Sequence, residues 1–433
     1  MKILLVGSGG RENALAWKIS NSESFKSTGS KLYCAPGNPG IARYAECIDI
    51  KSDNIPGLLS FALSEKIDLT VVGPEIPLAM GIVDKFNASG LKIFGPPASA
   101  AEIESSKLFA KELMKKFNIP TASFKSFSRD EKDKATEFIA ESSLPLVFKA
   151  DGLAAGKGVI IVNTNAEAFD ALDLMCAEDT FGDASQNFVI EEFLSGEEVS
   201  VFCITDGDDF VLLPFSRDHK KIGENETGKN TGGMGAVSPV HKFMHDDLRT
   251  KIIDKIVVPA LDAIKSEDRK FAGCLYCGLM ICNDEPYVIE FNCRFGDPET
   301  QSVLPLISSD FLELLFASAN GNMKNYKLET NALYSCCIVL ASGGYPDKFQ
   351  TGFEIDMKEL PDKNSIVFHS GTMQREGKLF TAGGRVLSVV GLSDASLENA
   401  LNTAYSAAAE ISYKGINYRR DIGKQLTEEA RSI

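Results

Sequence analysis

The 433-residue sequence predicts an α/β protein with more than one domain, and three observations lead to this prediction. Apolar strand-like runs alternate with helical stretches over residues 1–103, which is typical of a doubly wound parallel sheet. Strand-like runs return after residue 326 and are followed by one long helical stretch, which indicates a second, mixed sheet. A chain of this length exceeds what one hydrophobic core normally supports, so a middle region should separate the two.

The N-terminal region shows the alternation most clearly. Its expected strands and helices, in chain order, are Ile3–Val6, Glu12–Ile19, Lys31–Cys34, Ile55–Ser64, Leu69–Val72, Leu78–Ser89 and Lys92–Phe94. Short strands separated by helices need crossover connections, so the strands should run parallel.

The first turn, residues 7–12, contains three glycines and therefore suggests dinucleotide binding. That interpretation fails because Glu12 occupies the third glycine position and no acid ends the second strand. The turn still precedes a helix, whose first N–H groups favour anions. The residues expected at a phosphate here are Gly9, Gly10, Arg11 and Asn38. The alternative is a turn that serves only packing.

A glycine-rich hairpin is the most distinctive stretch of the middle region. Strand-like runs at Leu146–Phe148 and Val159–Val162 flank it. Glycines let backbone N–H groups approach a ligand closely, and a positively charged loop suits a polyphosphate. The alternative is a solvated surface hairpin. The residues of the expected polyphosphate site are Lys149, Gly156, Lys157 and Gly158.

Two further features flank this hairpin. Ser105 and Ser106 predict the cap of a helix that begins at Lys107, a lysine that in isolation indicates only a solvated residue. After the hairpin a strand ends at Glu191, and a second acid, Glu198, follows a turn. Acids at a strand end need donors, which an adenine amino group or ribose hydroxyls would supply. The alternative is a hinge with solvated acids.

A polar, glycine-rich stretch over Ile222–Pro239 follows a strand expected at Val211–Phe215. It has no internal periodicity, and irregular loops longer than about 12 residues are usually functional or disordered. We therefore expect a substrate loop. Its candidate residues, with those just before it, are Asp218, Lys220, Thr231, Gly232, Gly233 and Met234.

A third candidate site lies on the strand that begins at Tyr287. Side chains alternate along a strand, so Glu290, Asn292 and Arg294 should share one face. A carboxylate and an amide oxygen suit Mg²⁺, and a guanidinium offsets charge on a transferring phosphoryl group. The alternative is a plain salt bridge between Glu290 and Arg294.

The C-terminal region offers one more candidate. Its expected strands and final helix are Ser335–Ala341, Ile366–Thr372, Gly384–Val390 and Ala395–Ile411, and a helix at Phe311–Ala319 precedes them. A basic pair, Arg419 and Arg420, follows on a turn. Such pairs are usually surface charge, and a contact from Arg419 to a substrate phosphate is the alternative.

Composition excludes several classes of function. The net charge of −15 argues against nucleic acid or an anionic membrane as the main partner. The first apolar run is too short for a signal peptide and no run approaches about 18 residues, so we expect a cytoplasmic protein. Cys274 and Cys277 have metal-ligand spacing but lack a second pair or a nearby histidine, so we expect no zinc.

Together these motifs resemble the ATP-grasp superfamily and, within it, the phosphoribosylamine–glycine ligase family. The resemblance implies an ATP-grasp fold with a doubly wound domain at 1–103, an ATP-grasp domain at 104–325 that includes a lid subdomain at 120–190, and a C-terminal mixed-sheet domain at 326–433. Asn13 departs from the family pattern, in which histidine is common. The runs that carry the resemblance are Gly9–Leu15, Lys149–Val159, Asp218–Lys220, Asn230–Gly235 and Glu290–Gln301.

The resemblance also implies a reaction. ATP, glycine and 5-phosphoribosylamine would give ADP, phosphate and glycinamide ribonucleotide through a glycyl phosphate, in purine biosynthesis. It further implies Mg²⁺, with Mn²⁺ as an alternative, and we expect a monomer whose partners are these substrates.

The same resemblance implies roles for individual residues. The implied metal ligands are Glu290 and Asn292, and Arg294 would stabilise the transferring phosphoryl group. Asp218 would orient the glycine amine and Lys220 would contact the γ-phosphate or acyl phosphate. The implied ATP-binding residues are Lys107, Lys149, Gly156, Lys157, Gly158, Glu191, Leu194 and Glu198.

Other functions remain as alternatives. A different carboxylate–amine ligase or a carboxylase of purine precursors would keep the fold and change the acceptor, and the stretch Asp218–Gly235 should discriminate these. An NAD-dependent dehydrogenase conflicts with the missing third glycine. A regulatory ATP-binding module would have no need of the metal and phosphoryl residues together.

Overall fold

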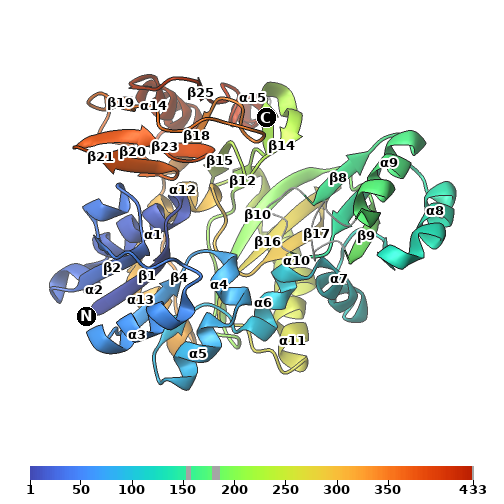
Figure 1. The fold of residues 1–433 in the computed structure, drawn as a ribbon, viewed down its shortest axis with the longest axis horizontal. Coiled ribbons are helices and arrows are strands. Elements are labelled where there is room, and N and C mark those ends of the chain that lie inside the picture. The colour runs from blue at the N-terminus through green and yellow to red at the C-terminus, as the bar shows by residue number, and fades with distance from the viewer. Residues whose placement is uncertain (153–157, 178–185, 432–433) are drawn as a thin grey trace.

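The computed structural model describes residues 1–152, 158–177 and 186–431 of the chain. In Figure 1 the N-terminal sheet lies beside the central strands, the C-terminal sheet lies above both, and the unit built from residues 124–192 projects to the right. Among the described residues, no helix is both long enough and apolar enough to cross a membrane.

The N-terminal region is a parallel sheet in the order β3-β2-β1-β4-β5, as predicted. Its strands are β1 (Lys2–Gly7), β2 (Lys31–Pro36), β3 (Glu46–Cys47), β4 (Leu69–Val72) and β5 (Ile93–Phe94). Its helices are α1 (Gly10–Asn21), α2 (Glu23–Ser27), α3 (Ile55–Glu65), α4 (Glu75–Ala79) and α5 (Ile82–Ala88). The single helix expected at 78–89 is wrong because Gly81, at φ +81°, ends one helix and begins another.

Two helices lead from this sheet into the middle region, α6 (Ala98–Ser105) and α7 (Lys107–Lys116). Ser106 Oγ accepts a hydrogen bond from the N–H of Phe109 at 3.0 Å, so the predicted cap is confirmed. The cap places Lys107 at the first turn of α7.

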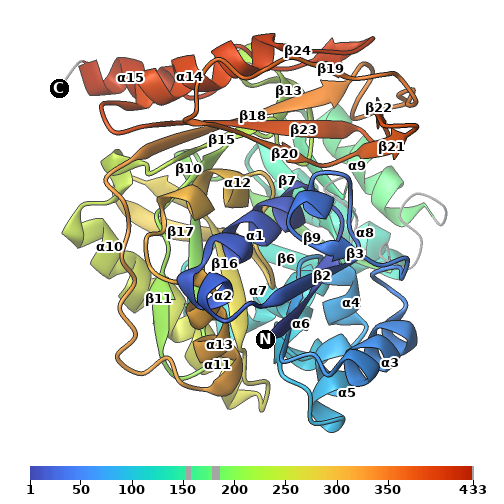
Figure 2. The same cartoon turned by 90° about the vertical axis from the view of Figure 1, so that its left-hand side faces the viewer.

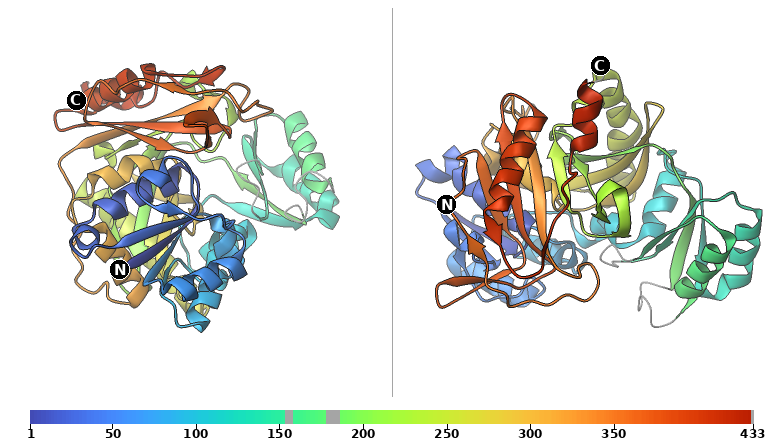
Figure 3. Two further views of the ribbon diagram at one scale, coloured as in Figure 1. Left: turned by 60° about the vertical axis from the view of Figure 1, so that its left-hand side comes forward. Right: turned by 90° about the horizontal axis from the view of Figure 1, so that it is seen from above.

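The projecting unit is an antiparallel sheet in the order β6-β9-β7-β8. Its elements are β6 (Phe124–Ser128), α8 (Lys132–Glu141), β7 (Leu146–Ala150), β8 (Val159–Val162), α9 (Asn165–Cys176) and β9 (Asn187–Glu192). It has its own hydrophobic core, in which Phe127, Phe148 and Phe188 are buried. The views in Figure 3 show it standing apart from the N-terminal and C-terminal layers.

The central sheet is antiparallel and runs in the order β11-β10-β16-β17. Its strands are β10 (Glu197–Thr205), β11 (Phe210–Leu212), β16 (Gly273–Cys282) and β17 (Glu285–Asn292). The helices of this part of the chain are α10 (Asp246–Ile252), α11 (Val258–Ser266), α12 (Glu299–Val303) and α13 (Phe311–Asn320), with a π-helical turn at Ile253–Val257 between the first two.

The C-terminal sheet has the order β12-β15-β18-β23-β20, with β25 beside β18. Its strands are β12 (Arg217–Asp218), β15 (Gly235–Ser238), β18 (Tyr334–Ser342), β20 (Ser365–His369), β23 (Arg385–Ser393) and β25 (Ile416–Asn417). Two-stranded ribbons and further helices accompany it: β13 (Lys221–Gly223) with β14 (Thr227–Asn230), β19 (Asp356–Met357) with β24 (Ile411–Ser412), β21 (Thr372–Arg375) with β22 (Lys378–Thr381), α14 (Leu397–Ala409) and α15 (Lys424–Arg431).

The expectation of an irregular loop over Ile222–Pro239 is wrong. This stretch forms β13, β14 and β15, and β15 pairs with β18. Strands this short show no periodicity, and they are fixed by partners elsewhere in the chain. The C-terminal sheet therefore takes strands from before residue 326, and Figure 2 shows this sheet lying over α1.

Candidate active site

The cations predicted for the phosphoryl chemistry converge on Glu290 of β17. Burial raises the pKa of this carboxyl, but nearby cations lower it below its usual value. In order of effect these cations are Lys220, Lys149, Lys107 and Arg294. Because they come from four separate segments, the fold assembles a cationic site around one carboxylate. Such a site suits a polyphosphate bridged by a divalent cation.

Lys149 of β7 and Glu191 of β9 form a buried ion pair. Lys149 Nζ donates to Glu191 Oε2 and to the carbonyl of Ile289, both at 2.9 Å. Lys111 Nζ, which the sequence did not indicate, lies 2.9 Å from the same Glu191 oxygen. The second oxygen of Glu191 is buried and has no hydrogen-bond partner among the described residues. It can therefore accept a hydrogen bond from a ligand amino group.

Lys107 contacts the described start of the hairpin. Its Nζ donates to the carbonyl of Gly152 at 3.1 Å, so the first turn of α7 and the hairpin are adjacent. Gly158 is described and closes the hairpin through its carbonyl, which accepts from a backbone N–H at 2.8 Å. Gly156 and Lys157 lie outside the described residues.

Two residues predicted for different parts of ATP are paired with each other. Lys220 Nζ donates to Glu198 Oε2 at 2.6 Å. Burial lowers the pKa of Lys220, but Glu198, followed by Tyr276 and Glu290, raises it well above its usual value. Lys220 therefore keeps its charge close to Glu290. Leu194 lies half-buried in the connection between β9 and β10.

A metal site at β17 fits the residues present. Glu290 and Asn292 stand two positions apart on the strand, and the Glu290 carboxylate has no hydrogen bond or ion pair within the described chain. Asn292 Oδ1 accepts only a long contact, 3.4 Å, from Arg294. The described residues contain no cluster of three or more His, Cys, Asp or Glu able to hold a metal. Two oxygen ligands suit Mg²⁺, which keeps water and phosphate as its other ligands.

Arg294 is held by two carboxylates that the sequence did not reveal. Its Nε lies 3.2 Å from Glu75 Oε2 and its Nη2 lies 2.8 Å from Glu104 Oε1. The second Glu104 oxygen accepts from the N–H of Cys293 at 2.7 Å. The simple salt bridge between Glu290 and Arg294 is therefore wrong as an alternative, because Arg294 has these other partners.

Asp218 carries an unpaired carboxylate oxygen. Its Oδ1 is buried and has no hydrogen-bond partner among the described residues. Burial, and after it the neighbouring Glu299, raises the pKa of Asp218 well above its usual value. Glu299 is itself buried and accepts from Ser200 Oγ at 3.1 Å. A cationic ligand at this point would offset the cost of the buried charge.

The expected N–H donors of the substrate stretch are already used. The N–H of Thr231 donates to the carbonyl of Lys220, and that of Met234 donates to the carbonyl of His219. The N–H of Gly232 donates to the Tyr345 hydroxyl at 3.0 Å, and that of Gly233 to Thr231 Oγ1 at 3.0 Å. Thr231, Gly232, Gly233 and Met234 stay predicted substrate residues, whose backbone N–H groups all bind protein acceptors in this arrangement. These bonds hold the stretch against β12 and the C-terminal sheet.

In the glycine turn at 7–12, the Glu12 carboxylate accepts hydrogen bonds from the turn itself. Glu12 Oε2 accepts from the N–H of Gly9 at 2.6 Å, and Glu12 Oε1 accepts from Arg11 Nε at 2.6 Å. Arg11 Nη1 donates to the carbonyl of Phe295, and the residue is only 8% exposed. A Cβ on Gly10 would lie 2.5 Å from Ser370 Oγ, so this glycine is needed for close packing. The Gly9 N–H and the Arg11 guanidinium are therefore bonded to the protein, and the phosphate contacts expected for Gly9, Gly10 and Arg11 stay predictions.

The side chain of Asn38 is also fully used. Its Nδ2 donates to the carbonyls of Ser8 and His369, each at 2.8 Å. Its Oδ1 accepts from the N–H groups of Gly40 and Ile41, each at 2.9 Å. All four hydrogen-bonding positions of the amide are satisfied, so Asn38 joins the N-terminal turn to β20 and does not face a phosphate.

Arg419 has a structural role as well. It is 2% exposed, and its guanidinium binds Glu226 at 2.6 Å and Asp421 at 2.8 Å. Its Nη1 donates to the carbonyl of Lys221 at 3.1 Å. These protein groups occupy the guanidinium, so a contact from Arg419 to a substrate phosphate stays a prediction that requires one of them to be displaced.

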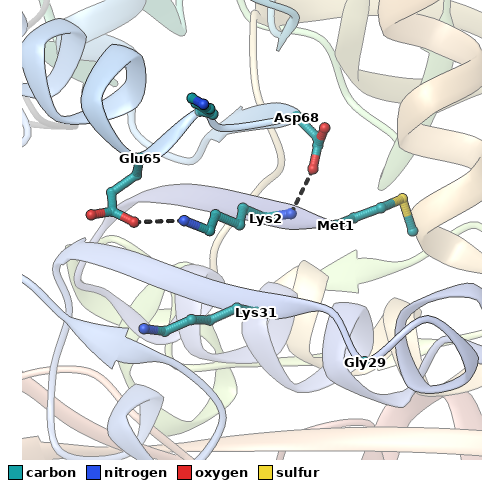
Figure 4. A pocket seen from close by; sticks show the side chains of 7 residues that line it. Met1, Lys2, Gly29, Lys31, Glu65 and Asp68 are labelled. Atoms are coloured by element: carbon teal, nitrogen blue, oxygen red, sulfur yellow. Dashed lines mark hydrogen bonds and ion pairs between the residues drawn. The ribbon is translucent and has the colours of Figure 1, made fainter.

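A surface hollow at the start of β1 lies away from these residues (Figure 4). Lys2 lines it, and its Nζ donates to Glu65 at 2.8 Å while its backbone N–H donates to Asp68 at 2.7 Å. The hollow is at the opposite end of β1 from the glycine turn. Lys2 and Lys31 pair with Glu65 and Glu46, and none of the predicted site residues that the structure describes lines the hollow, so we do not assign the active site to it.

Comparisons with known proteins identify the family of the chain. The models for phosphoribosylglycinamide synthetase match residues 1–104 (N domain), 105–300 (ATP-grasp domain) and 335–425 (C domain). The chain belongs to the phosphoribosylglycinamide synthetase family. A phosphoribosylamine–glycine ligase of Caldanaerobacter subterraneus subsp. tengcongensis is 47% identical over 425 residues, which cover 98% of this chain and 99% of that protein. One from Haemophilus influenzae is 44% identical and covers 99% of each.

Solved structures are similar along the whole synthetase chain. The phosphoribosylamine–glycine ligase of Thermotoga maritima matches with a TM-score of 0.83 at 32% identity, covering 98% of this chain and 100% of that one. A biotin carboxylase of Campylobacter jejuni matches with a TM-score of 0.72 at 17% identity, covering 97% and 93%, and shares the fold. The resemblance to ATP-grasp ligases predicted from the motifs is therefore confirmed. The synthetase is an ATP-dependent carbon–nitrogen ligase of purine biosynthesis, in a superfamily that generally uses ATP with Mg²⁺.

Proposed function

We propose that this chain joins glycine to 5-phosphoribosylamine through a glycyl phosphate, using the site around Glu290 and Asp218. One observation carries the proposal. Lys220, one of the cations that lower the pKa of Glu290, stands two positions after Asp218 in the chain, and Asp218 Oδ1 is buried and unpaired among the described residues. The first feature suits a polyphosphate, and the second suits the ammonium group of an amino acid.

The chemistry explains why both features are needed. A carboxylate resists attack by an amine, so its oxygen must first receive the γ-phosphoryl group of ATP, with ADP as the leaving group. The amine of phosphoribosylamine then attacks the acyl carbon, and the carbon–oxygen bond to phosphate breaks. Charge must be neutralised on the phosphoryl group in the first step and on the tetrahedral oxyanion in the second. Arg294 would supply that neutralisation, held in place by Glu75 and Glu104.

For ATP, we assign the phosphates to Lys107 and Lys149, with the hairpin at 156–158 over them. Glu191 Oε1, buried and unpaired among the described residues, would accept from the adenine amino group. The backbone at Leu194 would complete adenine binding, and Glu198 would share its hydrogen bonds between Lys220 and the ribose hydroxyls.

Glu290 and Asn292 would hold Mg²⁺, and Mn²⁺ prefers the same oxygen ligands. The bound metal would neutralise charge on the nucleotide phosphates during transfer.

For glycine, we assign the ammonium group to Asp218 Oδ1. Lys220 would contact the γ-phosphate and then the acyl phosphate, which its position beside Glu290 allows. The proton lost by the attacking amine would pass to the departing phosphate or to Asp218. We further propose domain limits at 1–103, 104–325 and 326–433 with a lid at 120–190, with β12 and β15 of the middle region completing the C-terminal sheet.

An acceptor and amino-acid screen tests this function. ADP release is measured with ATP and Mg²⁺ while glycine, phosphoribosylamine or both are supplied. We expect sustained ADP formation only when both are present, and loss of activity on chelation of the metal. Alanine or serine in place of glycine should reduce kcat/KM by roughly 10- to 200-fold, because each adds only a small group to the pocket. Equal rates with several amino acids would contradict the choice of glycine.

A further inference from the structure

The proposed reaction needs a group that binds the 5-phosphate of the acceptor, and the side chains expected for this role from the sequence are already bonded to the protein. Arg11, Asn38 and Arg419 are all occupied by protein partners. The phosphate carries up to two negative charges, and the chain as a whole has a net charge of −15. A nearby cationic side chain with N–H groups that no protein acceptor occupies is therefore required.

Arg385, the first residue of β23, has such an edge. Its Nη1 donates to the carbonyl of Gly232 at 2.5 Å and to that of Asp297 at 2.8 Å. The same nitrogen lies 3.3 Å from Asp297 Oδ1. Within the described part of the chain, Nε and Nη2 of Arg385 have no hydrogen-bond partner, and the side chain is 22% exposed. The guanidinium is thus fixed on one side and open on the other.

The surroundings of Arg385 place it where an acceptor must bind. A Cβ on Gly232 would lie only 3.1 Å from Arg385 Cζ, so the substrate stretch packs against the guanidinium. Asp297 Oδ2 accepts from the N–H of Arg11 at 3.4 Å, which connects Arg385 to the glycine turn. Burial lowers the pKa of Arg385, but Asp297, followed by Tyr345 and Asp218, raises it. A Cβ on the next residue, Gly233, would lie 2.8 Å from Asp218 Oδ1, so Arg385 and the carboxylate assigned to glycine pack against adjacent residues.

A free hydroxyl lies on the adjoining segment. The N–H of Gly371 donates to the carbonyl of Arg385 at 2.9 Å, which brings the end of β20 beside the start of β23. Ser370, the residue before Gly371, is partly exposed. Its Oγ has no hydrogen-bond partner among the described residues and lies next to Gly10.

We propose that Arg385 binds the 5-phosphate of phosphoribosylamine through Nε and Nη2, with Ser370 Oγ as a second donor. This inference rests on the proposed function and identifies a binding subsite within it. Two parallel N–H groups of a guanidinium match the spacing of two phosphate oxygens. The contacts of Nη1 with Asp297 and Gly232 hold the guanidinium in one orientation. Little side-chain entropy is therefore lost when Nε and Nη2 bind a ligand.

The test compares two ligands that differ only in the phosphate: the product glycinamide ribonucleotide and its dephosphorylated riboside. Their Kd values are measured by calorimetry on the wild-type chain, Arg385→Ala, Arg385→Lys and Arg375→Ala. Arg375 is an exposed arginine of the neighbouring β21 and serves as the matched control. We expect the wild type to prefer the ribonucleotide by roughly 10- to 100-fold, as charged hydrogen bonds imply.

Arg385→Ala should reduce that preference to less than about threefold without weakening the riboside, and Arg375→Ala should keep it. Arg385→Lys keeps the positive charge but lacks the two parallel N–H donors of the guanidinium. It should therefore give an intermediate preference for the ribonucleotide over the riboside. A full preference in Arg385→Ala would overturn this inference alone. A wild-type chain that binds neither ligand would overturn the proposed function together with it. Loss of affinity for both ligands in Arg385→Ala and in the folded Arg385→Lys chain would assign Arg385 to packing and also overturn the inference.

Discussion

Replacing Arg294 by alanine should lower kcat by roughly 1,000-fold and leave the Kd for ATP within about threefold. Arg294 follows β17, the strand proposed to bind the metal, and its charge lowers the pKa of Glu290. In the proposed mechanism its charge would act on the transition state, whereas Lys107 and Lys149 would bind the phosphates in the ground state. Steady-state ADP release gives kcat, and calorimetry with a non-hydrolysable ATP analogue gives the Kd.

The control must allow for the two carboxylates that lose their ion pair with Arg294 in this variant. Glu75 and Glu104 both pair with Arg294, so its removal leaves two negative charges without their partner and destabilises the fold. The double variant Arg294→Ala/Glu104→Gln removes one of those charges and should recover part of the stability but none of the activity. ATP affinity that fell in parallel with kcat would assign Arg294 to nucleotide binding and contradict the proposed role.

Asp218→Asn should raise the KM for glycine by roughly 10- to 150-fold, with little change in the KM for ATP. The substitution keeps the shape of the side chain and removes the charge that would bind the glycine ammonium group. Because Asp218 Oδ1 has no partner among the described residues, no protein contact has to be broken for glycine to bind. Initial rates over a range of glycine concentrations at saturating ATP give the change.

Asp347→Asn is the matched control for this variant, because Asp347 is an exposed aspartate whose partner is Lys229 at 2.7 Å. It should leave all three KM values unchanged, since exposed ion pairs contribute little. If Asp218→Asn instead lowered kcat at an unaltered glycine KM, Asp218 would act on the attacking amine and not on the ammonium group.

Much of the fold could be predicted from sequence patterns. In the N-terminal sheet, short apolar strands and helices alternate clearly, and the hairpin between β7 and β8 is bounded by obvious apolar runs. The stretch from 222 to 239 could not be predicted in this way. Its strands have three or four residues each, and β15 is fixed by pairing with β18, about a hundred positions later in the chain. Periodicity is not informative over such lengths.

The candidate site was only partly predictable for a related reason. The motifs indicate residue types that can bind ATP and metal, and Lys107, Lys149, Lys220 and Arg294 do converge on Glu290. A sequence does not show which side chains are occupied by the protein itself.

Arg11 and Arg419 have the right chemistry for a phosphate, yet carboxylates and carbonyls of the chain bind them. Glu104 and Lys111, conversely, stand on helices among other charged residues, and no local pattern distinguishes them from solvated ones. Their roles depend on partners on distant strands.

The glycyl phosphate is tested most directly by following the oxygen atoms of glycine. Glycine labelled with ¹⁸O in both carboxylate positions is converted in unlabelled water, and the released phosphate is analysed by mass spectrometry. We expect one ¹⁸O in each phosphate, because the oxygen that accepts the phosphoryl group leaves with it when the amine attacks, while the other remains in the amide of the product. Phosphate without label would contradict an acyl phosphate and, with it, the mechanism assigned to Glu290, Arg294 and Asp218.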